Sequence, residues 1–546
     1  MTINGGISSV VRGTAKMRDK KVSWILFTII LICDLAAGFY ICHIKHIVFG
    51  DAISRVANAF YVIYIQPPHL AAIGAVWNPL PSLLELPLML LWPIYKPIAT
   101  SGLAGVLMTS VFNAASGVLI FKNAIDFGRS RFVGLILALL YCFNPFVFIY
   151  GFNGMTEVPF SFMLLLFTFN FIKWMENENP SHIVSMAVAL ALAFLIRYEA
   201  IPVSICASLI VTIIILKVHR KKLVEEYRLS LKYSLQKAEG KNFVLISPVF
   251  YTFLIWVLFC WIIMGDPLYF LNSEYSISAF GRGYAVDPVL KKLIGNSWMT
   301  LQYVFLKTRV FLIPLIVIIG YRIIKRQIFK WDFLVLLILI LSTNILQFVD
   351  LRKGLSAGWW RYFLYPFPFI LAWIPYELKK MNSKLFTGLC IVSLIILNVS
   401  VGFAWFSNTI APEEYKDLSF KTLSPKEETQ REIAKFINVE IPHATILMDC
   451  VWTYNVIMNV THPENLVVSC SYQFKKAVEN PKLYNIDYIL VPSNGSDNIN
   501  QDAINIRYPN LYQKGADWCV LQREFSGLYK LYKVIKRPNK LANGLF

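Results

Sequence analysis

Charged residues are scarce in this chain. They make up 16% of its 546 residues, whereas hydrophobic residues make up 56%, and the mean hydropathy is +0.55. A soluble enzyme of this size would carry many more charges. Apolar runs long enough to cross a bilayer recur from Ser23 to Phe406, so the sequence predicts a polytopic α-helical membrane protein.

Several motifs are also missing. No zinc-finger, RNP or helix-turn-helix pattern accompanies the net charge of +19, so no nucleic-acid partner is expected. The basic residues fall mainly between the apolar runs, as in cytoplasmic loops beside anionic lipid. The nine cysteines show no CxxC or Cys/His metal spacing. Three of them, Cys450, Cys470 and Cys519, lie in the C-terminal tail, where one disulfide can form.

The basic residues orient the spans. Residues 1–22 are polar and basic, which predicts a cytoplasmic N-terminus. No small-residue cleavage site follows the first apolar run, so it is expected to be an anchor. Residues 80–93 are apolar but short, as in a re-entrant or interfacial segment; taking them as a crossing would invert the following loop. The alternation then gives about eleven spans: Ser23–Ile41, Ser101–Phe121, Phe132–Tyr150, Val158–Trp174, His182–Ile196, Ile201–Leu216, Phe243–Met264, Leu301–Tyr321, Phe333–Phe348, Tyr362–Tyr376 and Leu385–Phe406.

The domain organisation follows from this pattern. Residues 23–406 form the membrane domain, and residues 44–80 form its first outer loop. Residues 407–546 are more polar and predict a small α/β domain outside the cytoplasm. Its expected helices are Glu427–Asn438 and Phe474–Glu479, and its expected strands are Ala444–Met448, Leu466–Ser469, Tyr488–Val491 and 527–535. The tail has no Gly-rich phosphate loop, which favours an accessory or acceptor-docking role. We expect a multi-pass protein of the plasma membrane.

The first outer loop carries a candidate catalytic acid. At helical period, one face from Gly50 onward holds Asp51, Arg55 and Asn58, and the opposite face holds Val56, Phe60 and Ile63. This pattern predicts an amphipathic helix that lies flat on the membrane surface with its charges in water. Asp51 is then a candidate catalytic group. Alternatively, it merely caps the first turn of the helix.

Further charges interrupt the apolar runs near the same predicted membrane surface. Such residues are costly in lipid and therefore indicate function. They are Glu157, Arg197, Glu199, Asp266 and Arg361. Each has a structural alternative: Glu157 can cap a helix, Arg197 can pair with Glu199, and Arg361 can extend its head group to the interface. No comparable set of acids is expected at the opposite ends of the spans.

Together these residue types suit one reaction. An acid can take the proton of a hydroxyl, and a guanidinium can bind a phosphate. When a sugar–phosphate bond breaks, the phosphate gains negative charge, which a fixed arginine stabilises more than it stabilises the intact donor. The set therefore suits displacement of phosphate from a lipid-borne donor at the bilayer surface.

Several motifs occur in an order that resembles a known family. GDAISR is followed by PHLAAIGAVWNPLPSLLELPL, then by NPFVFIYGFNGMTEVPF, RYEA, GDPLYFLNSEYS and RYFLYPFP. This order resembles the GT-C superfamily of integral-membrane glycosyltransferases, in its protein-mannosyltransferase-like or dolichyl-phosphate-mannose-type branch. The likeness covers residues 21–406, and the tail resembles no family.

The resemblance implies a polyprenyl-phosphate sugar donor, a protein or glycan acceptor outside the cytoplasm, and inversion at the anomeric carbon. Asp51 would be the general base, and Arg361 and Arg197 would bind the donor phosphate. The remaining expected pocket residues are Arg55, Glu157, Glu199, Asp266, Tyr269, Tyr275 and Arg282. No metal or other cofactor is expected, because Asp51 has no acidic neighbour before Glu85 and a hard cation needs several oxygen ligands.

Two other functions remain open. A transporter or a flippase for lipid-linked glycans would usually show internal repeats and ionisable groups near mid-membrane, and the sequence shows no convincing repeat. A receptor-like protein that binds a partner through its tail would leave the outer charges unexplained.

Overall fold

The computed structural model describes residues 3–219, 231–273, 276, 287–407, 410–411, 414, 425–493 and 502–535. The predicted pocket residues Tyr275 and Arg282 lie outside these ranges. The chain divides into two compact units. The first comprises residues 1–40, 105–267 and 284–419, and the second comprises residues 41–104, 268–283 and 420–546.

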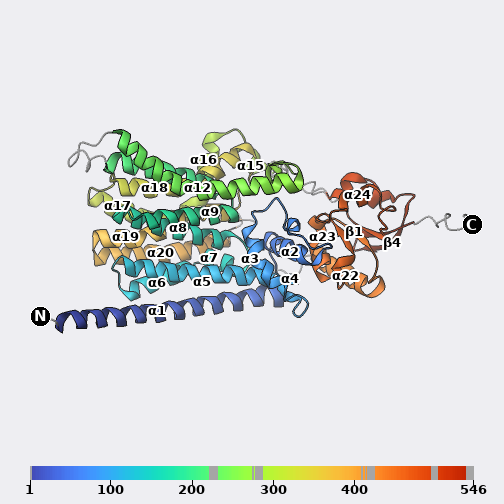
Figure 1. Cartoon of the computed structure of the whole chain (residues 1–546), viewed down its shortest axis with the longest axis horizontal. Coiled ribbons are helices and arrows are strands. Elements are labelled where there is room, and N and C mark those ends of the chain that lie inside the picture. The colour runs from blue at the N-terminus through green and yellow to red at the C-terminus, as the bar shows by residue number, and fades with distance from the viewer. Residues whose placement is uncertain are drawn as a thin grey trace, which may run out of the picture. The chain divides into compact units, whose positions relative to one another are not determined.

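The first unit is a bundle of long helices (Figure 1). Each predicted span lies largely within helix in the structure. The helices are α1 (Ile3–Gly38), α5 (Leu103–Asp126), α6 (Arg131–Cys142), α7 (Pro145–Phe152), α8 (Glu157–Asn177), α9 (Pro180–Ile196), α10 (Ala200–Ile214), α12 (Leu231–Met264), α16 (Ser297–Thr308), α17 (Ile313–Ile324), α18 (Trp331–Lys353), α19 (Pro366–Met381) and α20 (Lys384–Trp405). The predicted fold class, a polytopic helical membrane protein with a small C-terminal α/β domain, is confirmed.

Fewer helices than predicted are long enough to cross a membrane alone. Eight pass that test within the described residues, or nine when the pair α6 and α7 counts as one bent span. The pair bends by 67° because Asn144 caps α7 through the Phe146 amide and Pro145 begins a new first turn. The helices α9 and α19 have 17 and 16 residues, which is short for a crossing.

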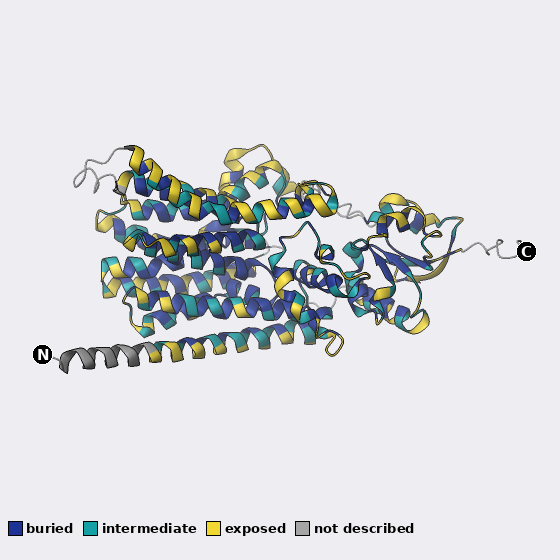
Figure 2. Cartoon of the chain, viewed as in Figure 1, coloured by how far each residue is buried: buried dark blue, intermediate teal, exposed yellow. Residues whose placement is uncertain are grey.

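Burial separates the central helices of this unit from its outer ones. The apolar window of α8 is 72% buried, whereas that of α12 is only 22% buried. Accordingly, α8 packs against both α9 and α19, and Figure 2 shows exposed residues along α12. Because α8 is central, its first residue, Glu157, is completely buried.

The second unit contains the first outer loop. Its elements there are α2 (Gly50–Tyr64), η2 (Leu70–Ile73), α3 (Leu80–Met89) and α4 (Pro97–Thr100). The prediction that α2 lies flat with its charged face in water is wrong. Arg55 is 5% exposed, and most of α2 is buried because α3, η2 and α4 pack around it.

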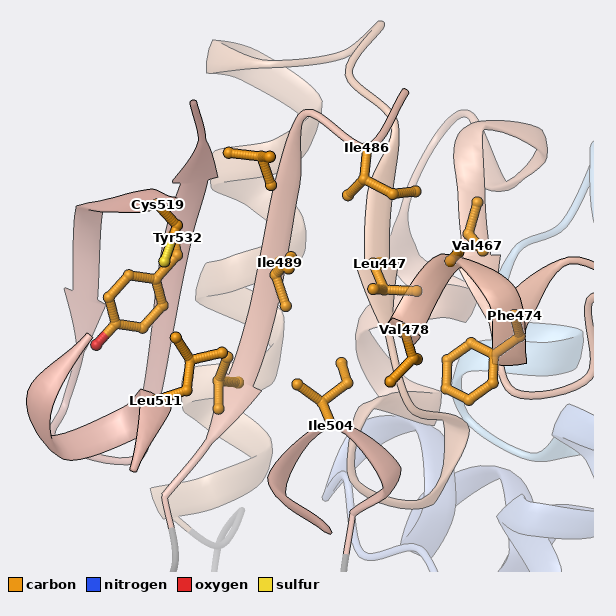
Figure 3. Close-up of a cluster of buried hydrophobic side chains, with 13 residues drawn as sticks. Leu447, Val467, Phe474, Val478, Ile486, Ile489, Ile504, Leu511, Cys519 and Tyr532 are labelled. Atoms are coloured by element: carbon orange, nitrogen blue, oxygen red, sulfur yellow. The ribbon is translucent and has the colours of Figure 1, made fainter. Parts of the chain in front are cut away.

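The C-terminal part of this unit is the predicted α/β domain. A five-stranded sheet has the order β2-β1-β3-β5-β4, in which β1 pairs in parallel with β2 and β3 and the last three strands are antiparallel. Figure 3 shows the apolar core on one face of this sheet. Its elements are α22 (Pro425–Glu440), β1 (Ile446–Met448), α23 (Cys450–Asn459), β2 (Leu466–Val468), α24 (Phe474–Glu479), β3 (Tyr488–Pro492), α25 (Ala503–Arg507), α26 (Leu511–Lys514), β4 (Cys519–Phe525) and β5 (Tyr529–Val534).

Candidate functional site

A buried ion network in the first unit joins four of the predicted site residues. Glu157 begins α8, and Arg197 follows the last residue of α9 in an extended conformation. Nη1 of Arg197 donates to Oε1 of Glu157 at 2.9 Å. Its Nε and Nη2 donate to Oε1 of Glu199 at 3.1 and 2.6 Å. The predicted Arg197–Glu199 pair is therefore present, but it belongs to a larger network.

Arg361 reaches the same carboxylate from another part of the chain. It lies in the 3-10 turn η5 (Trp360–Phe363), and its Nε is 3.6 Å from Oε1 of Glu157. Its backbone N–H donates to Oε1 of Glu414 at 2.9 Å. The guanidinium lies over the ring of Trp359, 4.2 Å from its centroid. Arg361 is 8% exposed, so it does not extend to the interface as a solvated charge.

The protein itself engages most of the donors of Arg197. Arg197 also donates from Nη1 to Thr156, so its contacts use four of the five N–H donors of a guanidinium. These bonds favour a positioning role for Arg197.

The network also contains polar atoms that its own bonds do not satisfy. Oε2 of Glu157, Oε2 of Glu414 and the hydroxyl of Tyr365 are buried without a hydrogen-bond partner among the described residues. The Arg197 guanidinium is 5.6 Å from the centroid of the Tyr365 ring. Buried polar atoms normally have partners, so this cluster has unused capacity to bind a polar ligand.

Asp51 and Arg55 belong to the second unit. Asp51 is half-buried in the first turn of α2. The N-cap residue is Phe49, so the alternative that Asp51 is an N-cap is wrong. Nη1 of Arg55 donates to the backbone carbonyl of Asp51 at 2.9 Å, and its guanidinium lies 4.5 Å from the Trp77 ring centroid. Arg55 thus fixes the turn that carries Asp51.

A second acid lies beside this helix. Glu85, on α3, is fully buried, and neither carboxylate oxygen has a hydrogen-bond partner among the described residues. Burial raises its pKa well above the usual value, although nearby Arg55 opposes the shift. In the sequence, Glu85 stands out only as the next acid after Asp51. Its position along the chain does not show that it is buried near Arg55.

The remaining predicted pocket residues add less. Asp266 follows α12 and is half-buried, and Tyr269 begins the short helix α13 (Tyr269–Asn272). Their roles stay predictions. Within the described residues, no group of three or more His, Cys, Asp or Glu side chains could hold a metal ion.

The expectation that acids gather only near the outer ends of the spans is wrong. Arg322, fully buried on α17, pairs with Glu377 on α19 and lies 2.8 Å from Asp332 on α18. Lys380 also pairs with Asp332. Arg322 and Lys380 follow apolar runs and were therefore expected in cytoplasmic loops. No short-range pattern in the sequence shows that α17, α18 and α19 meet there.

The long helices and the buried arginine–carboxylate network together define a polytopic membrane protein with a polar site among its helix ends. Residues 86–235 match the family described as dolichyl-phosphate-mannose-protein mannosyltransferase. This match confirms the predicted resemblance to GT-C superfamily glycosyltransferases. No curated protein matches the chain.

Three solved structures match this chain over most of its length at low sequence identity. The crystal structure of ArnT from Cupriavidus metallidurans bound to undecaprenyl phosphate is 11% identical over 96% of this chain and 99% of its own, with a TM-score of 0.46. The Archaeoglobus fulgidus oligosaccharyltransferase in its apo form is 10% identical over 85% and 69%, with a TM-score of 0.41. The archaeal oligosaccharyltransferase AglB from the same organism, in complex with an inhibitory peptide and a dolichol-phosphate, is 9% identical over 89% and 70%, with a TM-score of 0.39.

Proposed function

We propose that this protein is a membrane glycosyltransferase that moves a monosaccharide from a polyprenyl-phosphate donor to an acceptor outside the cytoplasm. The match of residues 86–235 to the dolichyl-phosphate-mannose-protein mannosyltransferase family carries this proposal. The proposed protein is multi-pass in the plasma membrane, with its N-terminus in the cytoplasm and its C-terminal domain outside. The acceptor is a protein or glycan hydroxyl.

In the proposed reaction, Asp51 is the general base. Its carboxylate takes the proton of the acceptor hydroxyl while that oxygen attacks the anomeric carbon. The bond between this carbon and the phosphate oxygen breaks, and its electron pair stays on the polyprenyl phosphate. Attack from the face opposite the leaving group inverts the anomeric configuration. The Arg55 hydrogen bond to the Asp51 carbonyl supports this role, because it holds the first turn of α2 in place.

Arg361 stabilises the leaving phosphate in this mechanism. The Glu414 bond to its backbone and the ring of Trp359 hold the residue in a single direction, so the charge needs little reorganisation when the donor bond breaks. Arg197 holds Glu157 in position from the side. Glu199 supports this arrangement, Arg55 supports the turn that carries Asp51, and the roles of Asp266, Tyr269, Tyr275 and Arg282 are proposed from the family motifs alone.

The decisive experiment uses purified full-length protein and radiolabelled polyprenyl-phosphate sugars in mixed lipid vesicles. Asp51→Asn should lower the rate of sugar release from the donor by about 10²–10⁴-fold while leaving thermal unfolding unchanged. The matched control is Asp517→Asn, an exposed acid of the C-terminal domain, which should retain the wild-type rate. Unchanged sugar transfer by Asp51→Asn would remove Asp51 from the mechanism. Transport of the intact donor without sugar release would refute the proposed glycosyltransferase activity.

A further inference from the structure

Two cysteines of the C-terminal domain stand opposite each other at the ends of neighbouring strands. The strands β1 and β2 are parallel, with Leu447 opposite Val467 and Met448 opposite Val468. The strands end at Met448 and Val468; Cys450 begins α23, and Cys470 lies in the turn that follows β2. Paired strands are about 4.8 Å apart, and disulfide-bonded cysteines have Cα atoms about 4.4–6.8 Å apart. Each cysteine thus follows the end of a paired strand by two residues, and a hydrogen bond between the two thiols places their sulfurs next to each other.

Hydrogen bonds join the two loops beside these cysteines. The backbone N–H of Cys450 donates to Oγ of Ser469 at 3.0 Å, and the Ser469 hydroxyl donates to Oδ1 of Asp449 at 3.2 Å. Asp449 is fully buried and accepts a third bond from the Ala503 amide at 2.8 Å. These bonds hold the two cysteines close without a covalent link; both are reduced in the structure.

The two thiols differ in acidity. Burial raises the pKa of the Cys450 thiol, but its hydrogen bonds with Cys470 and Ser469 together outweigh burial, so the pKa is lowered overall. The same hydrogen bond, together with burial, raises the pKa of Cys470. Such a pair combines an attacking thiolate with a thiol held in reserve to resolve a mixed disulfide. Both residues are partly exposed.

The dithiol lies at the part of the domain that α2 contacts. The helix α23 packs against α2, and the buried Tyr61 of α2 is within electrostatic reach of both sulfurs. The ring of His69, which follows α2, has Nε2 3.1 Å from the Cys470 carbonyl oxygen. One turn beyond Cys450, Tyr454 interacts electrostatically with Asp51. A bond between the cysteines would therefore fix the surface on which the helix of Asp51 rests.

We propose that Cys450 and Cys470 form a redox-active dithiol that closes to a disulfide by exchange with a disulfide-bearing thiol reagent or protein. The Cys450 thiolate attacks one sulfur of that disulfide, forms a mixed disulfide and releases one thiolate. Cys470 then loses its proton, attacks the Cys450 sulfur and releases the second thiolate. The two protein thiols are oxidised, and the exchange partner is reduced to two thiols. An effect on sugar transfer rests on the proposed function; the disulfide itself does not.

Peptide mapping of the intact protein tests the bond directly. Full-length protein in detergent is reduced, freed of reductant, incubated with oxidised glutathione and trapped with N-ethylmaleimide before digestion. We expect one linked peptide that joins Cys450 to Cys470, with Cys519 still alkylated as a free thiol. Cys519 is the matched control because it lies on β4, at the opposite edge of the sheet, and pairs with Val534 (Figure 3).

Two cysteine variants test which thiol attacks first and which one resolves the mixed disulfide. Cys470→Ser should hold glutathione on Cys450, because the resolving thiol is gone, whereas Cys519→Ser should form the same linked peptide as wild type. In reduced wild-type protein at pH 7, iodoacetamide should modify Cys450 several-fold faster than Cys470. Free Cys450 and Cys470 after prolonged oxidation of wild-type protein, or a link to Cys519, would overturn the proposal.

A separate measurement tests whether the Cys450–Cys470 disulfide affects sugar transfer through α2. The rate of sugar release from labelled donor should differ at least twofold between reduced and oxidised wild-type protein, and not between reduced and oxidised Cys450→Ser, which lacks the attacking thiol. If the two rates were equal although peptide mapping showed the disulfide, the proposed effect of the disulfide on sugar transfer through α2 would be wrong. Absence of sugar transfer in both states would count against the proposed function, while the peptide map still decides the disulfide.

Discussion

Nη1 of Arg197 lies 2.9 Å from Oε1 of Glu157, at the point where α9 ends and α8 begins. The Glu157 side chain is fully buried, and that of Arg197 is 13% exposed. Glu199 and Arg361 then balance the pair as a second acid and a second base. Neither charge of the central pair can be removed without leaving its partner poorly compensated in a low-dielectric site.

Arg197→Ala should therefore destabilise the protein by about 3–5 kcal/mol, because it leaves Glu157 buried with less compensation. Thermal unfolding in detergent measures this change. The double variant Glu157→Gln with Arg197→Met should recover part of the lost stability, since both charges are then absent. A single Arg197→Ala variant as stable as wild type would show that the pair does not hold α8 and α9 together.

Arg361→Lys tests the proposed phosphate contact. Lysine keeps the charge but not the planar group of donors that matches a phosphate, so transfer should fall about 10- to 100-fold. Initial rates at varied donor concentration measure the loss. Arg309→Lys, at an exposed arginine of the same unit, is the control and should behave as wild type. An Arg361→Lys protein with wild-type kinetics would exclude bidentate phosphate binding at this position.

Asp502 should make the stability of the C-terminal domain depend on pH. Burial and the neighbouring Asp449 raise its pKa to about 8, whereas an unfolded aspartate titrates near about 3.9. The folded state thus binds the proton more tightly, and its contribution to stability is complete below about pH 4. That contribution falls as the pH rises and is lost through about pH 8, by on the order of 5 kcal/mol.

Asp502→Asn should flatten this pH profile. Asparagine keeps an oxygen for the amides of Ile504 and Asn505, which Oδ1 of Asp502 now accepts at 2.9 Å each, but it does not ionise. Thermal unfolding of wild type and variant from pH 5 to pH 8.5 measures the difference. If Asp502→Asn and wild type lost stability in parallel, Asp502 would not be the titrating group.

Chelator treatment tests the proposal that no metal takes part. With the described residues offering no cluster of three metal-ligating side chains, dialysis against EDTA should leave the rate of sugar release within twofold of the untreated rate. Readdition of Mg²⁺ or Mn²⁺ should not raise it. A chelator-sensitive rate restored by a divalent cation would require a metal among the site residues.

The sequence identified the long helices of the membrane domain, because a run of apolar residues long enough to cross a bilayer is a local property. It also predicted β1, β2 and β3 from short apolar runs between polar loops, and β5 from the alternation of apolar and polar residues over 527–535. It did not predict the helix α23. It missed β4, because an edge strand with exposed residues between Cys519 and Phe525 has no apolar run. The bend between α6 and α7 was missed as well, since the run of apolar residues continues through it.

Residue chemistry in the sequence selected Glu157, Arg197, Glu199 and Arg361 as unusual, because charges beside spanning segments are costly. Only the tertiary structure decided that Glu157 forms ion pairs with both arginines, that Arg55 and Glu85 are buried, and that Arg322 meets Glu377 and Asp332. Helical periodicity records which residues share a face of one helix. It does not record which other helix covers that face, and the covering helix determines burial, pairing and pKa.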